Sequence, residues 1–342
     1  MITIDGSFGE GGGQILRTSL ALSLVTGRSF RINKIRAGRK KPGLMRQHLT
    51  AVNAAAAVGG ATVRGAEVGS LEVTFEPGPP SPGEYRFAVG TAGSTSLVMQ
   101  TVLPALLTAS GPSRLTLEGG THNPFAPPFD FLDKAFLPII NRMGARVSGE
   151  LERPGFFPAG GGKVVFEITP CDKLATLDLR ERGAIRRTLA RAVVARLPRQ
   201  IAERELSVVK RELGWEDECL RVEEVESSRG PGNVVTVEIE SEHVTEVFTA
   251  FGQRGVRAEV VARKAARAAR RYLDAGVAVG ECLADQLLLP LALAGGGSFV
   301  TLALSQHAET NIAVLREFLD VEIGCEKVGD DVRLVLVKSR SG

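Results

Sequence analysis

The feature of this sequence that most restricts its possible folds is a succession of elements that occurs three times. Each succession starts with a short apolar strand and passes through a glycine-containing loop into an apolar helix, followed by a strand, a second helix and two further strands. We place the three units at 2–75, 85–168 and 277–337. A fixed order that recurs along a chain is typical of a core built from similar units that pack together. The pattern therefore predicts an α/β fold of three βαβαββ repeats.

Residues 178–275 lie between the second and third units and do not follow this order. We predict helices at 185–196, 200–213 and 256–272, and strands at 220–226, 233–240 and 244–250. The chain is thus expected to divide into 1–177 and 276–342, which carry the repeats, and a smaller inserted α/β domain at 178–275. The last of these helices carries a run of cations, namely Arg263, Lys264, Arg267, Arg270 and Arg271. A run of this kind fits a phosphate-tracking surface and a solvated helix face equally well.

The composition says more about where in the cell the protein is expected than about what it does. No apolar run reaches the roughly 20 residues that a membrane-spanning helix needs, so we expect no membrane association. The chain opens directly on a strand pattern at 2–5, so we expect no signal peptide. The four cysteines are scattered and form no CxxC pair, which argues against a structural zinc site and fits free thiols in a reducing cytoplasm. The net charge of +3 neither demands nor excludes a nucleic-acid partner.

The loop before the first helix has the sequence GEGGGQ at 9–14. Glycines at this place leave backbone N–H groups able to face an anion at the helix N-terminus. The loop is neither a Walker A motif nor a GxGxxG motif, and a tight strand-to-helix turn explains it equally well on its own. A carboxylate such as Glu10 beside a phosphate-binding surface is more easily understood if a divalent cation lies between them.

A dense cationic loop follows the second strand of the first unit, with RAGRKKPG at 36–43 and RQH at 46–48. Arg17 lies one helix away. Several cations near a glycine-rich turn suit a phosphodiester or a polyphosphate, because arginine forks match phosphate oxygens. An exposed basic loop without a function is the alternative, and the glycine loop nearby favours phosphate binding. His48 fits a buried core histidine and a substrate contact equally well.

The third unit adds a histidine and a carboxylate. His307 lies between an apolar strand at 298–304 and a helix at 309–319, so we predict it in a strand-to-helix loop. A histidine that only forms local hydrogen bonds is the alternative. The segment GECLADQL at 280–287 opens the other helix of this unit, which we place at 285–294. Asp285 either caps that helix or offers a carboxylate to ribose hydroxyls or a metal, and Gln286 then offers an amide to a base.

The proline-rich loop at 119–128 is expected to form the wall of a pocket. We assign no catalytic role to His122, which lies in this loop, or to His243.

Together these segments resemble the RNA 3′-terminal phosphate cyclase family over essentially the whole chain. The motifs that carry the resemblance are GEGGGQILR (9–17), IRAGRKKPGLMRQHLTA (35–51), AGSTSLVMQTVLPALL (92–107), GGTHNPFAPPFDF (119–131), FFPAGGG (156–162), VGECLADQLLLPLALAG (279–295) and His307 with TNIAV (310–314). The resemblance implies three βαβαββ repeats, like the C-terminal domain of translation initiation factor three, with a smaller inserted α/β domain. The chain departs from the family pattern at Cys282, where members often have an aromatic residue.

The resemblance also implies a three-step reaction that uses ATP and a divalent metal, Mg²⁺ or Mn²⁺. His307 attacks the α-phosphorus of ATP and becomes a covalent histidine–AMP, the AMP passes to an RNA 3′-phosphate, and the neighbouring 2′-hydroxyl displaces AMP to form a 2′,3′-cyclic phosphate. By the same resemblance Glu10 is expected to contact the metal. The nucleotide is expected at Gln100, Cys282, Leu283, Ala284, Asp285 and Gln286, and the RNA or its phosphates at Arg17, Arg36, Arg39, Gln47 and His48.

Two other functions fit the same fold. A ribosome-assembly factor with this fold binds RNA or protein but lacks the nucleophilic histidine, and the presence of His307 favours the enzyme. An RNA adenylyltransferase that acts on other ends through the same histidine–AMP stays open as a side activity.

Overall fold

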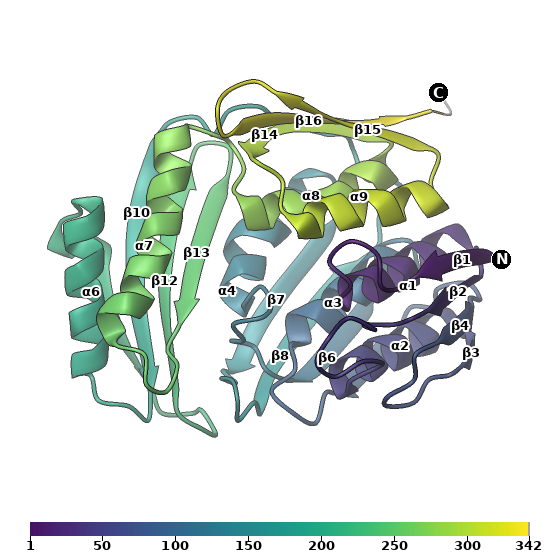
Figure 1. The fold of residues 1–342 in the computed structure, drawn as a ribbon, viewed down its shortest axis with the longest axis horizontal. Coiled ribbons are helices and arrows are strands. Elements are labelled where there is room, and N and C mark those ends of the chain that lie inside the picture. The colour runs from purple at the N-terminus through teal and green to yellow at the C-terminus, as the bar shows by residue number, and fades with distance from the viewer. Residues whose placement is uncertain (341–342) are drawn as a thin grey trace.

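The computed structural model describes residues 1–340. It confirms the α/β class, with three four-stranded mixed sheets around the helices packed between them, and a fourth mixed sheet beside them that has helices of its own (Figure 1). The described residues contain no helix that is both long enough and apolar enough to span a membrane.

Three of the sheets share one strand order, in which the first two strands are parallel and the other pairs antiparallel. The first sheet has the order β1-β2-β4-β3, the second β5-β6-β8-β7, and the third, written from its other edge, β9-β14-β16-β15. The strands of the first two sheets are β1 (Ile2–Asp5), β2 (Phe30–Asn33), β3 (Thr62–Arg64), β4 (Val73–Glu76), β5 (Glu84–Ala88), β6 (Ser113–Gly119), β7 (Arg146–Arg153) and β8 (Gly162–Thr169). Those of the third are β9 (Leu177–Leu179), β14 (Gly296–Leu302), β15 (Val321–Lys327) and β16 (Val332–Ser339).

Each of these sheets is crossed by two helical segments on one face. They are α1 (Gln14–Thr26) and α2 (Arg46–Gly59), then α3 (Thr95–Leu107) and the continuous run of α4 (Phe129–Phe131), a π-helical turn (Leu132–Phe136) and α5 (Leu137–Arg142), and finally α8 (Glu281–Ala294) and α9 (Gln306–Phe318). Helices α3 and α8 are apolar on almost every side and lie in the interior, as expected for helices surrounded by other elements. One core cluster joins all three sheets through these helices.

The inserted segment forms the fourth sheet, in the order β11-β10-β12-β13, with α6 and α7 on one of its faces (Figure 1). Its elements are β10 (Ile185–Ala195), α6 (Gln200–Leu213), a 3₁₀ turn (Asp217–Cys219), β11 (Leu220–Val225), β12 (Gly232–Ser241), β13 (Thr245–Phe251) and α7 (Ala258–Ala275). The segment has its own apolar core, which Leu302 of β14 joins. It is therefore packed against the third sheet and is not suspended on a linker.

Two predictions about this region differ from the structure. The helix predicted at 185–196 is wrong, because this segment is the central strand β10, parallel to β11 and antiparallel to β12. Its Arg, Leu and Ala residues favour a helix locally, but pairing on both edges outweighs that preference. The third unit also begins earlier than predicted, since β9 is the parallel neighbour of β14 and precedes the insert. The division of the chain at 178 and 275 stays a prediction.

Candidate active site

The site lies where the N-terminal ends of helices from all three sheets meet. Gln14 is the first residue of α1, Gln47 the second of α2, and His307 the second of α9. Hydrogen bonds between these ends join the first unit to the other two (Gln14 to His307 and Asp285, Gln47 to Ser94). Helix N-termini carry partial positive charge and unpaired N–H groups. Several such ends directed at one place suit a ligand with several phosphates.

His307 lies in the first turn of α9 and not in a loop, which corrects the prediction. The helix starts early because the Ser305 side chain accepts a hydrogen bond from the Ala308 N–H at 3.2 Å, which is an N-cap. The imidazole ring is exposed at the helix end. A side chain in this place is held by a rigid element and faces outward.

Gln14 determines which nitrogen of His307 carries the proton. The Gln14 amide donates to the Asp285 carboxylate at 2.7 Å, so its carbonyl oxygen faces His307, 2.7 Å from Nδ1. A carbonyl can only accept, so Nδ1 donates the hydrogen bond. The Nε2 atom of the neutral ring therefore keeps its lone pair and is the ring nitrogen that is able to act as a nucleophile.

Asp285 is the buried centre of this network, with 8% of its surface exposed. It accepts hydrogen bonds from Gln14, from Gln286 at 2.8 Å and from the Asn311 side chain at 3.3 Å. Burial raises the pKa of this carboxyl, and the hydrogen bonds from Gln14 and Asn311 and the charge of Arg17 oppose that rise. Asp285 lies in the second turn of α8 because the helix starts at Glu281, so it does not cap the helix.

The predicted nucleotide residues separate into two groups. Gln100 of α3 hydrogen-bonds to Gln286, beside an apolar cavity of about 160 Å³ between α3 and α8. Leu283 and Ala284 are buried in the core, because helical periodicity turns them away from Asp285, so their side chains are not available to a nucleotide. Cys282 is an exposed free thiol in the first turn of α8, so its side chain stays accessible.

Glu10 is the predicted metal ligand, and its surroundings leave part of its carboxylate without a partner. One oxygen forms an ion pair with Arg39, while Oε2 is buried without a hydrogen-bond partner. The loop is held to α9 by the Glu10 N–H, which donates to Thr310 Oγ1 at 3.0 Å. The described residues contain no group of three His, Cys, Asp or Glu side chains with metal-ligand spacing. A cation here would depend on Glu10 and on phosphate oxygens of a substrate, which is the usual arrangement for Mg²⁺.

The three arginines predicted to contact the RNA or its phosphates have different surroundings. Arg36 folds the loop back on itself by donating to the carbonyls of Lys41 at 2.7 Å and Gly43 at 2.9 Å. Arg17 is partly buried under the glycine loop, and burial lowers its pKa to about 10, so it stays charged at neutral pH. Arg39 reaches across the surface to Glu10.

Gln47 and His48 open α2. Gln47 accepts the Ser94 N–H at 2.8 Å and so positions the next loop rather than a ligand in this state. His48 is buried, and Nδ1 accepts the Met45 N–H at 3.1 Å. Burial and the charges of Arg17 and Arg36 lower the pKa of His48 to about 3, so the ring is neutral. Its remaining proton is then on Nε2, which is directed at Gly13 of the glycine loop.

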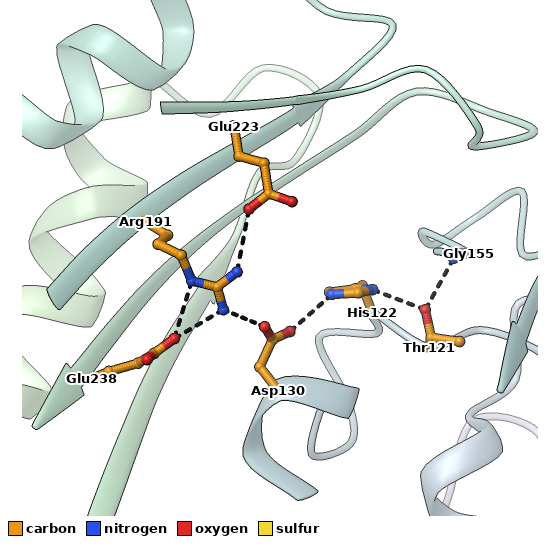
Figure 2. A network of polar contacts seen from close by, with 7 residues as sticks. All are labelled: Thr121, His122, Asp130, Gly155, Arg191, Glu223 and Glu238. Carbon is orange, nitrogen blue, oxygen red and sulfur yellow. Dashed lines mark hydrogen bonds and ion pairs between the residues drawn. The ribbon is translucent and has the colours of Figure 1, made fainter. Parts of the chain in front are cut away.

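His122 belongs to a network of polar contacts between the second unit and the insert (Figure 2). Its ring lies between the Thr121 hydroxyl at 2.8 Å and Asp130 at 3.0 Å. Asp130 also pairs with Arg191 of β10, which in turn reaches Glu238 and Glu223. Burial opposes ionisation of Asp130, but the hydrogen bond from His122 and the charge of Arg191 outweigh it and lower its pKa.

Sequence reasoning missed Gln14 and Asn311 as members of the site, and Thr18 as a residue of α1 that supports Asn311. Thr18 donates to Asn311 Oδ1 at 3.1 Å, and Asn311 then donates to Asp285. A polar residue that ends a glycine loop, such as Gln14, and a polar pair inside an apolar helix, such as Thr310 with Asn311, were the signals available. The partners of Gln14 and Thr18 lie more than 270 residues away in the chain.

Comparison with known proteins defines the class of this protein. The family described as RNA 3′-terminal phosphate cyclase matches residues 8–325, and the chain belongs to this family of enzymes.

Individual relatives agree with that family. Proteins named RNA 3′-terminal phosphate cyclase are 53% identical in Koribacter versatilis, over 100% of this chain and 97% of the relative, and 52% identical in Ectopseudomonas mendocina, over 100% and 98%. A protein of that name from Ralstonia nicotianae is 54% identical over 94% of this chain and 92% of its own length. The solved enolpyruvyl transferase NikO from Streptomyces tendae matches with a TM-score of 0.37 at 12% identity, over 95% of this chain and 46% of its own, and nothing follows from so low a score.

Proposed function

We propose that this protein converts an RNA 3′-terminal phosphate to a 2′,3′-cyclic phosphodiester at the expense of ATP, through a histidine–AMP on His307. The observation that carries the proposal is the hydrogen bond between the Gln14 carbonyl and Nδ1 of His307, which leaves Nε2 as the nucleophile. Membership of the cyclase family supports the choice of RNA as the substrate.

In the first step Nε2 of His307 attacks the α-phosphorus of ATP. The new P–N bond replaces the bond to the oxygen that bridges to the β-phosphate, and pyrophosphate leaves. The Nδ1 proton stays in its hydrogen bond with Gln14, which in turn is held by Asp285, so the positive charge that develops on the ring has a carboxylate behind it. The helix N-termini and Arg17 offset the charge on the phosphates.

In the second step an oxygen of the RNA 3′-phosphate attacks the same phosphorus, the P–N bond breaks, and His307 is restored. In the third step the vicinal 2′-hydroxyl attacks the RNA phosphorus, AMP leaves, and the hydroxyl proton is lost. Activation is necessary because a phosphate monoester lacks a good leaving group, whereas the ring closure itself is intramolecular and well oriented. We assign the RNA phosphate to the neighbourhood of Arg39 and of the Nε2–H of His48.

The residues present also fit one divalent cation, Mg²⁺ or Mn²⁺. Glu10 would hold it through Oε2, the oxygen that has no partner in the protein. When bound, a cation of this kind neutralises phosphate charge and polarises the phosphoryl oxygens.

An RNA whose 3′-phosphorylated terminal ribose carries 2′-H in place of the hydroxyl tests the order of steps. We expect this substrate to accumulate RNA(3′)pp(5′)A with ATP, because only the last step needs the hydroxyl. The matched RNA with a 2′-hydroxyl is expected to give a phosphatase-resistant end with one AMP and one pyrophosphate per end. Cyclic product from normal RNA with no adenylylated species from the 2′-deoxy RNA would contradict the mechanism.

A further inference from the structure

Three of the 15 phenylalanines are exposed, and all three lie in loops around the proposed active site. Phe8 precedes the glycine loop, while Phe125 and Phe157 lie in the loops after β6 and β7. Phe125 is 76% exposed and Phe157 48%. Burying a ring of this size is worth about 1.5–3 kcal/mol, and folding leaves that stabilisation unused at this exposed pair.

Phe125 and Phe157 form a pair on a rigid base. Their ring centroids are 5.7 Å apart and the rings are perpendicular. The buried Asn123 side chain fixes the first loop by accepting the Phe125 N–H at 2.9 Å and donating to the Ala92 carbonyl at 2.7 Å. The Phe157 N–H donates to the His122 carbonyl at 3.2 Å, which fixes the second loop. The two rings are thus held in place without being buried.

The pair is connected to the substrate residues through one shared loop, 90–94. Asn123 bonds to Ala92 of that loop, and Gly160 packs so closely on Thr91 and Ala92 that a side chain there would collide with their backbone. The other end of the loop is the Ser94 N–H, which Gln47 accepts. Loop 90–94 therefore contacts both the loops that carry Phe125 and Phe157 and the first turn of α2.

Arginine side chains lie near loop 90–94 and near the glycines that pack on it. Arg153 donates to the Gly161 carbonyl at 2.7 Å, and the side chain of Arg229, from the insert, packs against Gly161. Arg46 approaches Gly90 at the other end of the shared loop. Two exposed aromatic rings among arginines are the combination by which proteins hold single-stranded nucleic acid, with bases on the rings and phosphates on the cations.

We propose that Phe125 and Phe157 form a stacking platform for a nucleobase of the RNA strand upstream of its 3′-terminal nucleotide, with Arg46 and Arg229 on the adjoining phosphates. This inference rests on the proposed cyclase function. It assigns the insert a role, because Arg229 brings one of the cations. A single-stranded 3′ end is the chemistry that fits, since a base in a duplex has no free face for the rings.

The test uses the full-length protein and the variants Phe125→Ala, Phe157→Ala and the double variant, with Val328→Ala as the matched control. Val328 is 54% exposed in the turn after β15, which is none of the three loops. Binding of a fluorescent single-stranded hexanucleotide 3′-phosphate is measured by anisotropy, beside a nucleoside 3′-phosphate as competitor. Histidine–AMP formation from ATP alone is measured in parallel.

We expect each Phe→Ala change to weaken hexanucleotide binding by on the order of tenfold to a hundredfold, as loss of one stacked base does. Binding of the nucleoside 3′-phosphate and the rate of histidine–AMP formation should be unchanged, and Val328→Ala should match the wild type. An abasic residue at one upstream position of the hexanucleotide should weaken binding to the wild-type protein equally and should abolish the difference between wild type and variant.

Equal binding of the hexanucleotide by wild type and double variant would overturn the platform. So would an equal loss for the nucleoside 3′-phosphate, which would indicate damage to the catalytic site, or a change in sedimentation without a change in RNA binding, which would indicate an interface between two copies of this chain. Failure of the wild type to form histidine–AMP would count against the proposed function instead, because the binding measurement does not need ATP.

Discussion

The substitution Gln14→Leu tests the orientation of His307 most sharply. Gln14 is buried and forms two hydrogen bonds of 2.7 Å, one to the imidazole and one to the Asp285 carboxylate. A hydrogen bond between neutral groups is worth about 0.5–1.5 kcal/mol net and one to a charged group about 1.5–3 kcal/mol. Because Asp285 keeps Asn311 and Gln286 as partners, we expect a loss of about 2–4 kcal/mol in the free energy of unfolding.

The rate of histidine–AMP formation should change for a different reason. Without the carbonyl of Gln14, the ring proton is no longer held on Nδ1 and the ring can rotate about its bond to the helix. We expect the single-turnover rate at saturating ATP to fall by about 10- to 100-fold, which corresponds to about 1.4–2.7 kcal/mol in activation free energy. Transfer of label from α-labelled ATP to the protein measures this rate directly.

Thr18→Val is the matched control. It removes the buried hydrogen bond from Thr18 to Asn311, which also joins α1 to α9, but it does not touch His307. Both variants should therefore be destabilised, and only Gln14→Leu should lose the adenylylation rate. Equal rates in the two variants at temperatures well below their unfolding transitions would refute the role of Gln14 in setting the tautomer.

Three further predictions concern other carboxylates. Glu246 is buried against the Gly280 N–H and burial raises its pKa to about 8, so the folded state keeps a proton that the unfolded state loses near pH 4.5. The free energy of unfolding should fall as pH rises between those values, by up to about 1.4 kcal/mol per pH unit, and urea titrations of Glu246→Gln should show a flatter profile. Asp130→Asn should lower the free energy of unfolding in urea by about 1–3 kcal/mol, because it weakens the contact with Arg191 between the second unit and the insert. Glu72→Gln at an exposed ion pair should lower it by less than about 1 kcal/mol. Glu10→Gln should raise the Mg²⁺ concentration at which histidine–AMP formation is half-maximal, and an unchanged Mg²⁺ titration would remove Glu10 from the metal site.

The fold could be predicted well where local patterns agree with the tertiary structure. The strand at 2–5 is predicted to the residue, and α1 begins where the predicted glycine loop ends, since periodicity and turn chemistry point the same way. Residues 185–195 show the opposite case, because their composition favours a helix and only pairing with β11 and β12 makes them a strand. The position of β9 could not be predicted either. This strand has only three residues, and its partner β14 follows the insert in the chain, so no local pattern indicates the pairing.

The roles of the site residues stay predictions, and the sequence does not indicate how these residues are connected. His307, Asp285 and Glu10 are predicted from the sequence, whereas Gln14 is not, although it bonds to the first two of them. Its contacts span 293 and 271 residues of sequence, and no periodicity reports such a pair. The position of His307 in a helix and not in a loop follows from the Ser305 N-cap, which a serine at this place in the sequence indicates.

The covalent adduct is the measurement that tests the central claim most directly. Purified protein is incubated with α-labelled ATP and a divalent cation, then denatured and separated. We predict an acid-labile protein–AMP adduct that is absent in His307→Ala and is discharged by RNA ending in a 3′-phosphate but not by the same RNA ending in a 3′-hydroxyl. An adduct that persists in a folded His307→Ala protein, or no adduct in a folded wild-type protein that binds the RNA, would contradict the account.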